Sequence, residues 1–502
     1  MKPKTKKIVK IIIFLFAVLL VIFATIFTRN LGNLDEIWNY NFARNVANGL
    51  VPYRDFNMVQ TPLLPLLASV FLNLFTNQLI IMRALAVVLN TAIFFLIYQI
   101  MRKLKINQYV VYTFLLLAFF ILKDHIAIDY NFAILLVVLI MLYLEINYSM
   151  KKKIVSFCVK YDLLLGILAG VCFTLKQSTG VVIILATVFY KLLGIRKKQE
   201  LKTYGRIVAM RLLGAFIPIL CLVLYLCYHQ AWSEFANYAI AGMTTFSNKI
   251  AYWSLFQNLH WYIKVLAILY PITLICMIVI TVFTRNKKVL ILTAYGIAES
   301  VVMFPITDEI HFLIGIVPIM IGFTYIFSVL LRRMKYGYHQ TKWLFYARSF
   351  LKCTVTLTIL LTVIVGLKQT ISYFQKVKTY NQFECYKGIR ISTSLSKNIH
   401  SIDEFIQNQT KKVYILDAEA AIYKIPLGLY DKDYDMFLKG NLGKDAEQGQ
   451  IEKIDKQENA LFLLKNDVVS RNWQNPEQVR KYLKQNYKKI GEIEYFDIYE
   501  KR

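Results

Sequence analysis

The run IVKIIIFLFAVLLVIFATIF, residues 8–27, is apolar apart from one Lys near its start. About 20 helical residues cross the roughly 30 Å of hydrocarbon in a bilayer, so this run predicts a membrane span. The composition agrees, because a soluble domain of this length would not be 57% apolar with 15% aromatic residues. The preceding MKPKTKK resembles a signal peptide, but the apolar core is too long and lacks a cleavage site. We therefore expect an uncleaved signal anchor.

The formal net charge of +28 raises the question of nucleic acid binding, which its distribution answers. Lys and Arg cluster in alternate loops, whereas the intervening loops hold isolated cations. This alternation is the positive-inside pattern of a membrane protein, and we expect no nucleic acid partner. The basic clusters lie near residues 2–10, 102–105, 151–153, 196–206, 285–288 and 332–348.

Charge alternation and apolar runs together predict about eleven transmembrane helices. With a cytoplasmic N-terminus, an odd number of spans places the C-terminus outside the cell. We expect an all-α membrane domain over 1–374, with a first outer loop at 29–80, and an extracytoplasmic α/β domain over 375–502. The predicted spans are 8–28, 81–101, 108–122, 130–147, 161–176, 180–194, 207–228, 262–283, 289–304, 310–330 and 353–373.

The first outer loop contains two short helical patterns. Residues 36–48 place Trp38, Phe42 and Val46 on one side and end at Gly49, with Asp35 expected at the N-cap. Residues 61–75 are apolar but too short and too rich in Pro to cross alone. We expect both pieces to lie along the outer membrane interface.

The segment after residue 374 changes to a mixed-charge pattern typical of a soluble domain. KKVYILDAE and ALFLL indicate buried strands, and IGEIEYFDIYE indicates a closing strand. SIDEFIQNQ begins with a capping-box pattern at Ser401, and NPEQVRKYLKQNY has Asn475 at the expected N-cap and Pro476 at the first helical position.

Ionisable residues gather at the predicted outer ends of the spans, and we expect no comparable set of acids on the inner side. Placing an ionisable side chain near lipid costs free energy. A chain that keeps such residues there is expected to use them, so they are functional candidates. Other interpretations stay open: Asp35 as a helix cap, Arg54 and Asp55 as an exposed turn pair, and Asp129 as a solvated acid. The gathered residues are Asp35, Glu36, Arg54, Asp55, Asp129, Lys176, Asp308, Glu309 and His311.

The stretch DEIWNYNFARNVANGLVPYRDF, followed by TPLLPLL, resembles the GT-C glycosyltransferase superfamily, in particular its protein O-mannosyltransferase and aminoarabinose transferase branch. The resemblance rests on an acidic pair after the first span, an interfacial helix, a G-x-x-P-Y turn and a Pro-containing helix. The many-span layout and the outer C-terminal domain agree with it. Where the family has a basic residue before paired prolines, this chain has Gln60, Thr61 and Pro62. The phosphate contact is therefore expected at Arg54 or Lys176.

The resemblance implies an enzyme that transfers a sugar from a polyprenyl-phosphate donor to an acceptor on the outer face, namely a cell-envelope glycan, a lipid or a protein. A carboxylate can remove the proton of the attacking hydroxyl, and a fixed cation can stabilise the leaving phosphate. We expect Asp35 to be the general base, supported by Glu36, with inversion at the anomeric carbon. Arg54 and Lys176 are the expected phosphate contacts, and Gln177, Asp308 and His311 the expected pocket lining.

Two other classes of protein remain as alternatives. A transporter of a lipid-linked substrate would carry polar groups near the bilayer midplane, on broken helices. A non-catalytic assembly or sensor protein would display the 375–502 domain and tolerate changes at Asp35 and Lys176. We expect no resident cofactor and no dedicated metal ligands, with a divalent metal at Asp308, Glu309 and His311 as the alternative.

Overall fold

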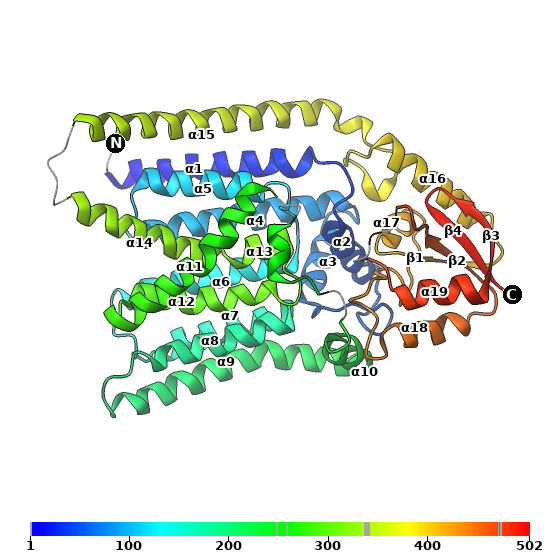
Figure 1. Ribbon diagram of the computed structural model, residues 1–502, viewed down its shortest axis with the longest axis horizontal. Helices are drawn as coiled ribbons and strands as arrows, with labels where there is room; N and C mark the ends of the chain where they lie inside the picture. The colour runs from blue at the N-terminus through cyan, green and yellow to red at the C-terminus, as the bar shows by residue number, and fades with distance from the viewer. Residues whose placement is uncertain (1–2, 247–248, 258–259, 336–341, 470, 472–473) are drawn as a thin grey trace. The chain divides into compact units, whose positions relative to one another are not determined.

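The computed structural model describes residues 3–246, 249–257, 260–335, 342–469, 471 and 474–502. The chain divides into two compact units, each assembled from separate stretches of sequence (Figure 1). The first contains residues 1–28, 84–220 and 250–375. The second contains residues 29–83, 221–249 and 376–502, so the first predicted outer loop belongs to the same unit as the C-terminal segment.

The first unit is helical over its described residues. Each predicted span coincides with a helix or, at 310–330, with the pair α13 and α14. Three helices, α4, α9 and α15, continue into the second unit, α15 by its last residue alone. The helices of this unit are α1 (Pro3–Phe27), α4 (Leu79–Lys103), α5 (Gln108–Leu122), α6 (Tyr130–Ser149), α7 (Val159–Leu175), α8 (Gln177–Leu192), α9 (Glu200–Tyr228), η3 (Tyr252–Phe256), α11 (Trp261–Thr284), α12 (Lys287–Ser300), η4 (Val301–Met303), α13 (Glu309–Gly315), α14 (Val317–Lys335) and α15 (Lys342–Lys376).

Six of the described helices are long and apolar enough to cross a membrane, and a seventh span results if α13 and α14, bent by 49°, are counted together. This number is typical of a multi-pass membrane protein. The remaining predicted spans correspond to shorter helices, such as α5 with 15 residues and α12 with 14. The apolar pattern therefore located the helices, but the described part of the chain does not reach the predicted total of eleven spans by length and composition.

Small residues let α7 and α9 approach closely within the first unit. A Cβ atom built on Gly166 of α7 would lie 2.2 Å from the carbonyl oxygen of Arg211, and one on Gly214 would lie 2.4 Å from that of Leu163. Gly166 and Gly170 form a G-x-x-x-G pattern, which is typical of tightly packed membrane helices. Figure 1 shows α7 running alongside α8.

The second unit combines helices with one small sheet. Its elements are α2 (Leu34–Ala47), α3 (Leu63–Leu74), α10 (Trp232–Phe235), η1 (Ala236–Ile240), η2 (Ala241–Met243), η5 (Val377–Thr379), η6 (Glu384–Tyr386), α16 (Thr393–Gln407), β1 (Lys412–Leu416), α17 (Ala420–Lys424), α18 (Ala446–Asp455), β2 (Ala460–Lys465), α19 (Glu477–Asn486), β3 (Tyr487–Ile493) and β4 (Phe496–Lys501).

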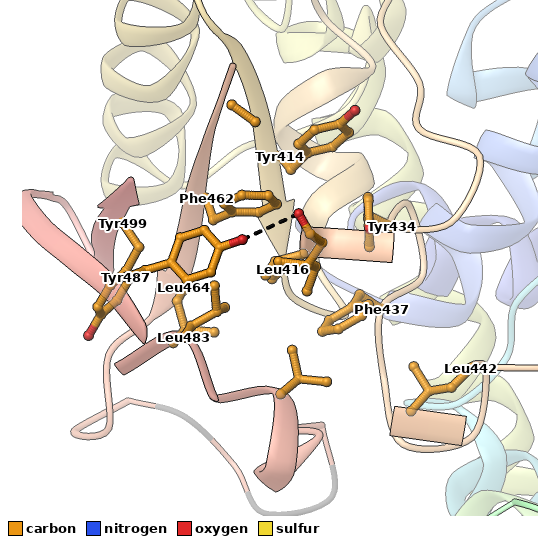
Figure 2. Packing of buried hydrophobic residues seen from close by; sticks show 13 residues of the cluster. Tyr414, Leu416, Tyr434, Phe437, Leu442, Phe462, Leu464, Leu483, Tyr487 and Tyr499 are labelled. Atoms are coloured by element: carbon orange, nitrogen blue, oxygen red, sulfur yellow. Dashed lines mark hydrogen bonds between the residues drawn. The ribbon is translucent and has the colours of Figure 1, made fainter. Parts of the chain in front are cut away.

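The four strands form a sheet in the order β1-β2-β4-β3, with β1 and β2 parallel and the other pairs antiparallel. Every residue of β2 is buried, as expected for a central strand covered on both faces. Figure 2 shows the aromatic core on one face, where Phe462 packs edge-on against Tyr487 with ring centres 5.6 Å apart. The Tyr487 hydroxyl donates to the Ile454 carbonyl at 3.3 Å.

The strands predicted within KKVYILDAE (411–419) and ALFLL (460–464) are confirmed as β1 and β2, whereas three local predictions are wrong. The capping box at Ser401 is wrong because α16 begins at Thr393, where Ser392 caps it by accepting from the Leu395 N–H. The closing strand is a hairpin of two strands, because the chain turns at Glu494, which has a φ of 48°. Helix α19 begins at Glu477, and Pro476 rather than Asn475 is its flanking residue.

The two helical patterns of the first predicted loop differ in their exposure. Helix α2 is mostly buried inside its unit, including Ile37, Tyr40 and Phe42. Helix α3 leaves an apolar stripe exposed at the spacing of one helix face, formed by Leu67, Val70, Phe71, Leu74 and Phe75. Four residues separate the end of this helix from the candidate span α4. An interfacial position therefore stays a prediction that suits α3 better than α2.

We predict that Gly166→Leu lowers the yield and the thermal stability of the full-length protein purified in detergent. Its side chain would overlap the α9 backbone, so the two helices must separate. The matched control is Gly205→Leu, since Gly205 lies on α9 with nothing within 4 Å of a built Cβ. Equal melting temperatures for the two variants would contradict the close packing.

Candidate functional site

The acidic pair lies in the first turn of α2, in the second unit. The predicted N-cap at Asp35 is wrong, because the cap is Asn33, which has extended backbone angles of −77° and 117° and accepts from the Glu36 N–H. Asp35 is half-buried in the first helical turn. There the unpaired N–H groups of the helix give a partial positive charge that favours a carboxylate. Helix capping therefore does not account for Asp35.

Glu36 is fully buried and its carboxylate forms a bidentate pair with Arg83, at 2.9 Å from Nε and 3.0 Å from Nη2. Arg83 is also fully buried, and it donates further to the carbonyl of Arg29 at 2.8 Å. The Arg29 guanidinium lies 3.7 Å from the same carboxylate. Because both oxygens of Glu36 are held in this way, its geometry suits a supporting role better than proton transfer.

Sequence reasoning missed Arg83. It lies in MRALAVVLN, at the start of the apolar run that becomes α4. An arginine in an apolar run is itself a signal, because an ionised side chain there needs a partner. Nothing in the sequence, however, indicates that this partner is Glu36, which lies 47 residues earlier in the chain.

Arg54 and Asp55 form an exposed turn pair, in agreement with the alternative interpretation of these two residues. The Arg54 guanidinium donates to both Asp55 oxygens, at 3.0 and 2.7 Å, and its side chain is 46% exposed. The hydrogen bond from Arg54 holds the pKa of the Asp55 carboxyl below its ordinary value. A phosphate at Arg54 would therefore compete with a carboxylate that already occupies it.

Lys176 and Gln177 lie at the break between α7 and α8, in the first unit. Lys176 has extended backbone angles of −157° and 112°, so it ends one helix and precedes the next. Its ammonium group donates to the Asn131 side chain at 3.1 Å and lies 5.2 Å from the centre of the Tyr130 ring. Gln177 is buried at the start of α8.

Asp129 directly precedes Tyr130 and Asn131, two contacts of Lys176, and it is buried, so its interpretation as a solvated acid is wrong. It is 1% exposed, caps α6 by accepting from the Asn131 N–H at 2.7 Å, and keeps its second oxygen without a hydrogen-bond partner. Burial raises the pKa of Asp129, against the opposing effects of that hydrogen bond, His311 and Lys176. Asp129 thus interacts with two of the predicted site residues, Lys176 and His311.

Asp308 caps α13 and faces His311 one turn later. Its carboxylate accepts from the His311 N–H at 2.9 Å and lies 2.7 Å from the Nδ1 atom of the ring. Burial raises the pKa of Asp308, but His311 and these hydrogen bonds outweigh it and the net change is downward. Glu309 points instead to His125, at 3.3 Å. Among the described residues, no three His, Cys, Asp or Glu side chains are grouped to hold a metal ion.

We expected no comparable set of acids at the inner ends of the spans, and this expectation missed two buried acids. Two buried acids, Glu145 and Asp162, lie near the ends of α6 and α7 that are remote from Asp129 and Lys176. Arg211 pairs with Glu145 at 2.8 Å and with Asp162 at 2.9 Å, and Lys191 lies 3.6 Å from Glu145. Two acids and two bases therefore neutralise one another inside the first unit, which fits a structural role.

Comparison with known proteins identifies the fold. No family model and no curated protein matches the sequence. Among solved structures, ArnT from Cupriavidus metallidurans bound to undecaprenyl phosphate is 10% identical, with a TM-score of 0.58 over 99% of this chain and 98% of that one. The chain therefore has the fold of the GT-C glycosyltransferases, as its resemblance implied.

Two further solved structures are similar over smaller parts of the two chains that are compared. The oligosaccharyltransferase of Archaeoglobus fulgidus in its apo form is 12% identical with a TM-score of 0.43, and this chain spans 60% of its length. The protein O-mannosyltransferase complex of S. cerevisiae bound to the sugar donor is 17% identical with a TM-score of 0.33, over 47% of this chain and 36% of that one. The conclusion about the fold rests on ArnT.

We predict that Glu36→Gln destabilises the protein by about 3–5 kcal/mol, because it leaves buried Arg83 without its compensating charge. Thermal unfolding of the full-length protein in detergent measures the effect. The control is Glu384→Gln, since Glu384 is 79% exposed and its ion pair with Lys387 is long, at 3.9 Å. If the two variants unfold at the same temperature, the buried pair does not support α2.

Proposed function

We propose that this chain is a membrane glycosyltransferase that moves a sugar from a polyprenyl-phosphate donor to an acceptor at the outer face. The acceptor is a cell-envelope glycan, a lipid or a protein. The fold supports the reaction class, because ArnT shares it over nearly the whole of both chains and binds undecaprenyl phosphate. In this proposal the N-terminus is cytoplasmic and the second unit is extracytoplasmic.

The observation that carries the proposal is the placement of the acidic pair. Asp35 lies in the first turn of α2, where capping is done by Asn33, and the neighbouring Glu36 is locked to Arg83. One carboxylate of the pair thus anchors the helix, and the other is half-buried beside it. This division of roles suits a general base on a rigid support.

The reaction follows from these groups. Asp35 takes the proton of the acceptor hydroxyl as its oxygen bonds to the anomeric carbon. The bond from that carbon to the phosphate oxygen breaks, and its electron pair leaves with the lipid phosphate. A single displacement of this kind inverts the anomeric centre. Glu36 acts by positioning α2.

Lys176 is the proposed phosphate contact. Its ammonium is held by the Asn131 side chain and the Tyr130 ring, so little further ordering is needed when a ligand binds. Gln177, Asp308 and His311 are proposed to bind substrate, with Arg54 as a secondary phosphate contact. The negative charge that grows on the leaving phosphate is stabilised most by a cation fixed in advance.

We predict that Asp35→Asn lowers turnover by about 10²- to 10⁴-fold, because an amide cannot accept the proton. The assay supplies a polyprenyl-phosphate sugar and an envelope extract to the purified full-length protein. Glu458→Gln, an exposed acid of the same unit, is the control and should transfer sugar at the wild-type rate. Equal transfer by Asp35→Asn and wild type would remove Asp35 from the chemistry.

We also predict that Lys176→Gln lowers turnover by about 10²- to 10³-fold, the usual loss for one group that stabilises a developing anion. Arg54→Gln should cost less, because Arg54 is half-exposed and paired with Asp55. Measuring turnover at a saturating donor concentration for both variants shows which substitution lowers it more. A larger loss of turnover in Arg54→Gln than in Lys176→Gln would assign the main phosphate contact to Arg54.

A further inference from the structure

The segment Asp431–Asp435, with the sequence DKDYD, places carboxylates at three alternate positions of the second unit. Such spacing is typical of calcium-binding loops, whose oxygens converge on one ion. Here the three carboxylates have separate protein donors. Asp431 pairs with the buried ammonium of Lys424.

Asp433 joins three stretches of the chain through one oxygen atom. Its Oδ1 accepts from Asn57 Nδ2 at 2.8 Å, from the Tyr238 hydroxyl at 2.6 Å and from Lys453 Nζ at 2.6 Å. The Asn57 N–H also donates to the Lys432 carbonyl at 2.9 Å. The segment is therefore attached to the chain that follows α2 and to the chain that follows α9.

Asp435 reaches α2 itself. Its Oδ2 accepts from Asn41 Nδ2 at 3.0 Å, and its Oδ1 accepts from the Asp431 N–H at 2.8 Å. Asn41 and Asp435 are 2% and 4% exposed, so water cannot replace the bond if it is lost. Its neighbour along the helix, Trp38, donates to the Ala418 carbonyl at 2.7 Å.

These contacts hold the helix that carries the acidic pair. Asn41 follows Asp35 by six residues, which is about 9 Å along a helix. The first turn is held by Glu36 and Arg83, and the second turn by Asp435. Two attachments at different heights fix both the position and the tilt of a rigid helix.

We propose that Asp435 is a positioning residue for Asp35, acting through Asn41 and helix α2. This proposal rests on the proposed function, since it takes Asp35 as the general base. The C-terminal segment then contributes to the rate of the reaction without touching the substrate. A small displacement of a catalytic group is enough to slow a reaction about 100-fold.

A charge swap tests the proposal. Asn41→Asp sets two buried carboxylates against each other and should speed amide hydrogen exchange over residues 34–47 and lower kcat about 100-fold, with KM little changed. Adding Asp435→Asn restores a bond between an amide and a carboxylate, because the new amide donates to Asp and still accepts from the Asp431 N–H. The double variant should recover slow exchange and at least a tenth of the wild-type kcat.

A matched control comes from an exposed pair of the same chemistry in the same unit. Gln78 Nε2 donates to a Glu384 oxygen, and Gln78→Glu should leave exchange in α2 and kcat unchanged, because water screens the two charges.

The outcomes separate the two proposals. If the wild-type protein transfers no sugar, the proposed function fails, and hydrogen exchange alone decides whether Asp435 holds α2. If exchange in α2 is the same in Asn41→Asp as in wild type, the attachment is absent and the proposal is overturned. Recovery of slow exchange without recovery of kcat would also overturn it, since Asp435 would then stabilise α2 without positioning Asp35.

Discussion

The buried pair between Glu36 and Arg83 is the interaction on which the rest of the candidate site depends. Two ionised side chains without exposure to water are stable only when each satisfies the other, and here the bidentate geometry does so. The pair connects the first turn of α2 to the first turns of α4, so the acidic pair is tied to a candidate membrane span. The neighbouring Asp35 thereby gains a fixed support.

The second unit shows how distant segments of sequence hold one helix. The backbone N–H of Leu31 donates to the Arg390 carbonyl at 2.8 Å, next to α2, and Asn57 is held at Asp433 and Lys432 beyond it. The C-terminal segment therefore packs with the first predicted loop as one compact unit. The expected boundary of an extracytoplasmic domain at residue 375 stays a prediction, and the unit that contains this segment also includes residues 29–83 and 221–249.

The positions of the helices could be predicted well, because an apolar helix leaves a direct periodic signal in its own sequence. Which charged side chains are buried could not be predicted in this way. The sequence left open whether Asp129 is a solvated acid, and only the fold shows that it is buried, where it interacts with Lys176 and His311. Glu145 and Asp162 were overlooked, as isolated acids within apolar runs whose partner Arg211 lies on α9.

By itself, the sequence determined the membrane-spanning character, the acidic pair after the first span and strands β1 and β2 of the small sheet, because each of these depends on neighbouring residues. Only the tertiary structure decided which acid of the pair is bound by Arg83 and which residue caps α2. Asn33 replaces Asp35 as the cap, and Arg83 engages Glu36. Ion pairs and hydrogen bonds depend on distances in space, and residues 47 positions apart become partners only once the chain has folded.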